Sequence, residues 1–128
     1  MPKILVVADT PWVTNEVHAA LGLTGFEIQD HTDPRTLTDA VASFEPDLAI
    51  IDMQVAAMGG MAMARALKAS AYSKGSSEMP VILLLDRSAD AFLAKRAAAD
   101  AWLLKPFTAA ELRDAVAAVW TGEPAARA

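Results

Sequence analysis

Apolar residues fall into short runs that alternate with amphipathic stretches along the chain. Five of these runs predict strands, at 3–8, 26–30, 48–51, 80–85 and 101–104. Most of them are continuous, which is typical of parallel strands buried on both faces. The run Phe26-Glu-Ile-Gln-Asp30 instead alternates between apolar and polar residues, as a half-exposed strand does. The pattern therefore predicts a parallel sheet with 26–30 at an edge.

Turn and capping signals between the runs predict five helices, at 10–23, 33–45, 59–69, 88–99 and 108–122. Thr10-Pro11 opens the first helix, because proline suits an early helical position. Thr108 and Glu111 have the spacing of a capping box at the start of the last helix. The segment 71–78 is rich in serine and predicts a loop.

Strands and helices in strict alternation predict a three-layer α/β sandwich with right-handed crossovers and helices on both faces of the sheet. A flavodoxin-like (βα)5 fold with strand order 2-1-3-4-5 would bring the first and third strands together. A chain of 128 residues, 54% of them hydrophobic, has room for one domain with a substantial core. We expect this domain over residues 1–122, followed by a tail or truncated linker at 123–128.

The formal net charge is −5, which argues against a nucleic-acid-binding face on this domain. The chain contains no cysteine, so disulfides, thiolate zinc sites and thiol catalysis are excluded. No apolar stretch reaches the roughly 18 residues of a membrane span. We expect a cytoplasmic protein whose partners are proteins or small ions.

Three of the apolar runs end in a charge, namely Asp9, Asp52 and Lys105. Ligands of open α/β sheets bind beyond the carboxyl ends of the strands, so these side chains are expected to share a site. Two carboxylates about 4 Å apart repel by about 4 kcal/mol at an effective dielectric near 20, and a divalent cation removes that penalty. Such a site could hold a cation and an anionic group.

The chain resembles the response-regulator receiver domains of two-component signalling over nearly its whole length. The matching segments are Ile4-Leu-Val-Val-Ala-Asp9, Leu48-Ala-Ile-Ile-Asp52 with Met58-Gly-Gly60, and Trp102-Leu-Leu-Lys-Pro-Phe107, of which the last is the most specific. The resemblance implies that Asp52 accepts a phosphoryl group from a histidine kinase or phosphotransfer protein. Lys105 would contact the phosphoryl oxygens, and the bond between Lys105 and Pro106 would be cis.

The resemblance also implies Mg²⁺ as the cofactor, with Asp9 and Asp52 as ligands and Gln54 offering its backbone carbonyl. Magnesium binds through a few carboxylates, waters and phosphate oxygens, which leaves room for the phosphoryl group. A downstream protein target would bind the face formed by the fourth helix, fifth strand and fifth helix, and a homodimer through the last two helices is plausible. No membrane or nucleic-acid partner is expected for this domain.

Four residues bear on how far the family pattern holds. Ala8 stands where receivers carry another acid, and Asp86 stands where they prefer a small residue. Asp86 could repel phosphate or replace the missing acid as a magnesium ligand. Leu85 stands where the family has a threonine or serine that bonds the phosphoryl group, and Trp102 is at its aromatic switch position. A hydrogen bond to a charged group contributes about 1.5–3 kcal/mol, as much as a typical allosteric coupling, so its loss could erase the switch.

The leading interpretation is a phosphorelay receiver with weakened switch coupling, whose catalysis extends at most to its own phosphorylation and dephosphorylation. The alternative is a pseudo-receiver that acts as an interaction module without phosphorylation. Plainer roles also exist, since Asp9 could cap the first helix and Lys105 could be a surface lysine. Trp12 and Trp120 are more often buried at such positions, although either could contact a partner if exposed.

Overall fold

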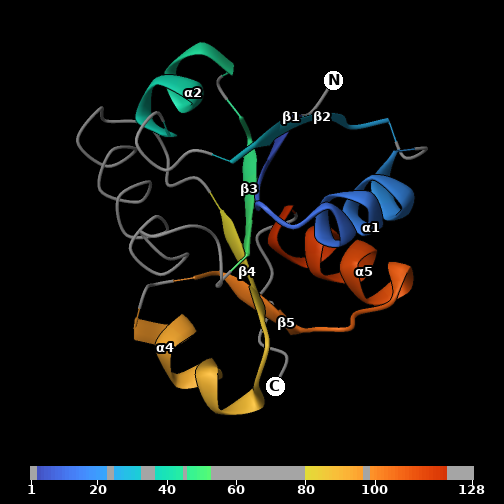
Figure 1. The fold of residues 1–128 in the computed structure, drawn as a ribbon, viewed down its shortest axis with the longest axis vertical. Coiled ribbons are helices and arrows are strands. Elements are labelled where there is room, and N and C mark those ends of the chain that lie inside the picture. The colour runs from blue at the N-terminus through green and yellow to red at the C-terminus, as the bar shows by residue number, and fades with distance from the viewer. Residues whose placement is uncertain are drawn as a thin grey trace.

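The computed structural model describes residues 3–22, 25–32, 37–44, 46–52, 80–96 and 99–120. These residues form one parallel sheet with the strand order β2-β1-β3-β4-β5 (Figure 1). The strands are β1 (Lys3–Val7), β2 (Glu27–His31), β3 (Leu48–Asp52), β4 (Val81–Leu85) and β5 (Ala101–Leu104). The predicted topology is therefore confirmed.

Helices cover both faces of this sheet. They are α1 (Pro11–Leu21), α2 (Leu37–Phe44), the short 3₁₀ helix η2 (Ser88–Asp90), α4 (Ala91–Arg96) and α5 (Ala109–Trp120). Figure 1 shows α1 and α5 on one side of the sheet and α2 and α4 on the other. The predicted three-layer sandwich is confirmed in the described part of the chain.

The core divides into two clusters, because alternate residues of each strand point to opposite faces of the sheet. On β1, Ile4 and Val6 pack toward α1 and α5, while Leu5 and Val7 pack on the opposite face with Phe44 of α2. Every residue of β3 and β4 is buried. Burial on both faces is the physical reason that these strands are continuous apolar runs.

The ends of the helices follow the predicted signals closely. The Thr108 N–H donates to Glu111 Oε1 at 2.8 Å and the Glu111 N–H donates to Thr108 Oγ1 at 3.1 Å, which confirms the capping box of α5. α1 begins at Pro11 and ends at Leu21, where the Gly22 N–H donates to the carbonyl of His18 at 2.8 Å. Gly25 has a φ of +89°, a conformation that glycine adopts without strain.

Several elements differ from the predicted bounds by one or two residues, and β2 and the helix after β4 differ most clearly. β2 begins at Glu27 and ends at His31, so it lies one residue later than predicted. The predicted helix at 88–99 is a 3₁₀ turn followed by the α-helix Ala91–Arg96. In that turn the Asp90 N–H donates to the carbonyl of Arg87 at 3.0 Å, three residues back, so the first turn is tighter than an α-helix.

Some predictions lie outside the described residues. These are the start of the second helix at 33–36, the helix at 59–69, the loop at 71–78, the end of the last helix at Gly122 and the tail at 123–128. Among the helices that the structure does describe, none combines the length and apolar character required to cross a bilayer.

Candidate functional site

Three charged side chains come from the carboxyl ends of neighbouring strands. Asp52 is the last residue of β3, Asp86 follows β4 directly, and Lys105 follows β5 directly. The Lys105 N–H donates to the carbonyl of Leu85 at 2.8 Å, which continues the pairing of β5 with β4 by one residue. This hydrogen bond sets the lysine beside the end of β4.

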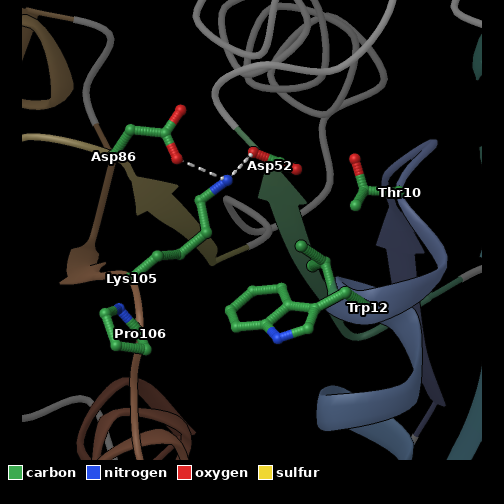
Figure 2. A pocket seen from close by; sticks show the side chains of 7 residues that line it. Thr10, Trp12, Asp52, Asp86, Lys105 and Pro106 are labelled. Atoms are coloured by element: carbon green, nitrogen blue, oxygen red, sulfur yellow. Dashed lines mark hydrogen bonds and ion pairs between the residues drawn. The ribbon is translucent and has the colours of Figure 1, made fainter.

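The Lys105 ammonium lies between two carboxylates. Its Nζ donates to Asp52 Oδ1 at 2.7 Å and forms an ion pair with Asp86 Oδ1 at 2.9 Å (Figure 2). The Asp52 side chain is 1% exposed and that of Lys105 is 12% exposed, whereas that of Asp86 is 40% exposed. Two carboxylates thus share one ammonium group.

The two carboxylates also control the protonation of the lysine. Burial lowers the pKa of Lys105, but hydrogen bonds from its ammonium to Asp52 and Asp86, together with the charges of both, outweigh burial and raise the pKa above its ordinary value. Lys105 therefore remains a cation at neutral pH. A fixed ammonium beside a buried carboxylate is suited to neutralising an anion that arrives at that carboxylate.

A cavity of about 420 Å³ adjoins this cluster at the carboxyl edge of the sheet. Its lining residues are Thr10, Trp12, Val13, Asp52, Asp86, Lys105 and Pro106. The peptide bond between Lys105 and Pro106 is cis, as the resemblance implied. Position and charge agree with the expectation that a ligand site lies beyond the strand ends.

The predicted metal ligands occupy different positions relative to this cavity. Asp52 and Asp86 line it, while Asp9 is an exposed residue after β1 whose neighbour Thr10 lines the cavity. Gln54 lies outside the described residues. Within the described ranges, no three His, Asp or Glu side chains gather as a metal centre. Magnesium needs only one or two carboxylates when phosphate oxygens and waters complete its shell, so the pair at the cavity fits it.

The predicted switch residues lie behind the site. Leu85 is fully buried and belongs to the same core cluster as Trp102, which is 9% exposed. The Lys95 ammonium lies 5.9 Å from the centre of the Trp102 ring. Leu85 brings only an apolar surface to the end of β4, so it offers no hydroxyl to a group bound at Asp52.

Trp12 follows the less favoured of the two expectations for its position, exposure rather than burial. Burial was the favoured expectation, but Trp12 is 44% exposed and lines the cavity. Its ring meets that of Phe107 edge-on, with centroids 6.0 Å apart. Thr10 and Pro106 were also not predicted to line the site. Their positions directly beside predicted strand-end residues were the available signal.

These features define a doubly wound α/β protein with an acid–base cluster at the carboxyl edge of its sheet. The sequence model of the response regulator receiver domain matches residues 4–117, and the chain belongs to this family. As a family, receiver domains of two-component systems are phosphorylated on an aspartate by histidine kinases and bind Mg²⁺ at the phosphorylation site.

Relatives and solved structures agree with this assignment. The chain is 31% identical over 113 residues to the transcriptional regulatory protein PrrA of Mycobacterium tuberculosis, covering 87% of this chain and 46% of PrrA. It is 30% identical to the DNA-binding response regulator MtrA of Mycolicibacterium smegmatis over 86% of this chain and 46% of that protein. The chain thus spans about half the length of these curated relatives.

Two solved structures share the fold. The chemotaxis protein CheY4 of Vibrio cholerae superimposes with a TM-score of 0.80 at 24% identity, covering 93% of this chain and 98% of that one. The receiver domain of a signal transduction histidine kinase from Syntrophus aciditrophicus gives a TM-score of 0.81 at 27% identity, covering 95% and 92% of the two chains.

Proposed function

We propose that Asp52 is the phosphoacceptor of this receiver domain and that Lys105 neutralises the phosphoryl group. The observation that supports this most directly is the 2.7 Å contact between the Lys105 ammonium and Asp52 Oδ1 in the wall of an open cavity. An incoming phosphoryl group would meet a carboxylate nucleophile and a cation at the same point. Phosphoryl transfer needs little more than such positioning and charge neutralisation.

In the proposed reaction, an Asp52 carboxylate oxygen bonds to phosphorus as the phosphorus–nitrogen bond of a donor phosphohistidine breaks. The departing ring nitrogen keeps the electron pair and takes a proton from solvent. Lys105 moves its hydrogen bond from the carboxylate to a phosphoryl oxygen. Chemistry at Asp52 is thus limited to phosphorylation and later hydrolysis of this same chain.

Magnesium is the cofactor that this site fits, with Asp52 and Asp86 as the carboxylates at the cavity and Asp9 and Gln54 as further predicted ligands. When bound, the metal ion would supply positive charge to the phosphoryl oxygens. Asp86 already holds Lys105 at 2.9 Å, so its carboxylate would be shared between the ammonium and the metal ion. Asp86 would then replace, as a magnesium ligand, the acidic residue that other receivers carry at the position of Ala8.

We further propose that phosphorylation of Asp52 has only a weak effect on the conformation of the surface formed by α4, β5 and α5. Leu85 is fully buried against the cluster that contains Trp102, and it has no hydroxyl with which to report a phosphoryl group. The same observation favours the second candidate function, a pseudo-receiver that binds a protein target without phosphorylation. In both cases the target would bind the face formed by α4, β5 and α5, and a histidine kinase or phosphotransfer protein is the partner of the first candidate only.

Incubation with acetyl phosphate and Mg²⁺, followed by intact-mass measurement, tests the proposal. We expect a mass increase of one phosphoryl group that Asp52→Asn abolishes. The matched control is Asp114→Asn, the same substitution at an exposed carboxylate of α5, which should leave the increase unchanged. An unmodified wild-type chain under these conditions would support the pseudo-receiver instead.

A further inference from the structure

Trp12 differs in position from the other large apolar residues that are exposed in the described part of the chain. The exposed large apolar residues in the described ranges are Trp12, Phe92 and Leu104, at 44%, 64% and 41% exposure. Only Trp12 among them lines the cavity that holds Asp52 and Lys105. Single exposed apolar residues are common on protein surfaces, so the informative feature of Trp12 is its place in the cavity wall beside Asp52 and Lys105.

The indole is also held in position. Its ring meets the Phe107 ring at 69° with centroids 6.0 Å apart, an edge-to-face contact, and Phe107 is 6% exposed. Figure 2 shows the Trp12 ring reaching from α1 toward Pro106, beneath the side chains of Asp52 and Lys105. A preorganised ring loses little conformational freedom when a ligand packs against it.

We infer that Trp12 is a positioning residue for the leaving group of the phosphoryl donor, and that it favours an aromatic one. This inference rests on the proposed function and names the donor class for that same site. A phosphohistidine donor carries an imidazole ring on phosphorus, opposite the oxygen that attacks. The Asp52 side chain is 1% exposed and lines the cavity, so a donor reaches it from the cavity. Among the described residues that line this cavity, Trp12 is the exposed large apolar one.

Comparing two donors with different leaving groups distinguishes a contact between Trp12 and the leaving group from a purely structural effect of Trp12 on the site. Phosphoimidazole and phosphoramidate both donate through a phosphorus–nitrogen bond, but only phosphoimidazole has a ring to lie against an indole. In each case Asp52 gains the phosphoryl group, and imidazole or ammonia departs with the electron pair and a solvent proton. The ratio of the two rates therefore reports the ring contact, while effects on Asp52, Lys105 or the metal ion cancel.

The experiment measures phosphorylation rates of the full chain with each donor in Mg²⁺, by intact mass. Aromatic contacts predict that Trp12→Leu lowers the ratio of the phosphoimidazole rate to the phosphoramidate rate by about two- to tenfold. Trp12→Phe should keep most of the ratio, because it keeps an aromatic face. Leucine retains apolar bulk beside Phe107, and thermal unfolding of both variants checks that the fold is intact.

The possible results are distinct. A ratio that Trp12→Leu leaves unchanged, or rates that fall equally for both donors, would overturn the inference about Trp12 while leaving Asp52 as the acceptor. A wild-type chain that accepts a phosphoryl group from neither donor would overturn the proposed function, and the inference with it.

Discussion

Asp52 and Lys105 are 53 residues apart in the chain, yet their side chains meet at 2.7 Å. The parallel order of the sheet creates this contact, because β3 and β5 flank β4 and end at the same edge. The carboxylate is almost completely buried and the ammonium nearly so. Each of these charges would be costly to bury without the other.

The first prediction concerns the energy of this pair. Lys105→Met leaves Asp52 buried beside Asp86 without the ammonium, so we expect the free energy of unfolding to fall by about 1–3 kcal/mol. Asp52→Asn removes the buried charge and should lower the penalty of Lys105→Met. Urea unfolding of the two single variants and the double variant gives the coupling, expected at about 1–3 kcal/mol. Additive effects would contradict a direct interaction.

The second prediction is a dependence of stability on alkaline pH. Burial lowers the pKa of Lys105, but the hydrogen bonds and charges of Asp52 and Asp86 outweigh burial. The pKa in the folded state is therefore raised above the ordinary value of 10.5. The folded chain therefore binds this proton more tightly than the unfolded chain does. The resulting stability is complete below the unfolded pKa and is lost as pH rises through the folded pKa. Urea unfolding from neutral pH upward should show wild type losing stability relative to Lys105→Met in this alkaline range. Parallel curves for the two proteins would refute it.

The third prediction separates the two roles open to Asp86. If its carboxylate binds magnesium, Asp86→Asn should weaken Mg²⁺ binding severalfold by calorimetry, while Asp114→Asn has no effect. Because Asp86 is 40% exposed, we expect its ion pair with Lys105 to change stability by less than about 1 kcal/mol. Unchanged magnesium affinity together with faster phosphorylation of Asp86→Asn would indicate that Asp86 repels phosphate instead.

The fourth prediction restores the missing hydroxyl. Leu85→Thr places a hydroxyl at the end of β4, and Leu85→Val is its nearly isosteric apolar control. Both variants lose buried apolar volume, and the threonine should cost about 2–3 kcal/mol of stability. With Trp12→Phe and Trp120→Phe making Trp102 the sole tryptophan, phosphorylation should change its fluorescence in the threonine variant and not in the valine variant. Equal responses in the two would remove the hydroxyl as the cause.

Much of this architecture could be predicted because its causes are local or periodic. Continuous apolar runs marked the buried strands, and the spacing of Thr108 and Glu111 marked the cap of α5. The convergence of Asp52 and Lys105 followed from the rule that parallel strands end at one edge. Resemblance to the family then supplied the roles.

The orientation of Trp12 could not be predicted, because the sequence near a helix start does not fix which side of the helix faces a cavity. The ion pair of Asp86 with Lys105 depends on the hydrogen bond from the Lys105 N–H to the carbonyl of Leu85, a contact between segments that are distant in the sequence. The tight 3₁₀ turn at Ser88–Asp90 likewise leaves no periodic signal in three residues. These features come from tertiary structure, where short sequence patterns carry little information.

The edge strand β2 affects how readily molecules of this protein associate in concentrated solution. It pairs only with β1 in the described sheet, it is five residues long, and its exposed residues are the acidic Glu27 and Asp30, of which Asp30 contacts His18 of α1. Charges on a short border strand discourage backbone pairing with a neighbouring molecule. Concentrated solutions of this protein should therefore resist fibril growth from that side.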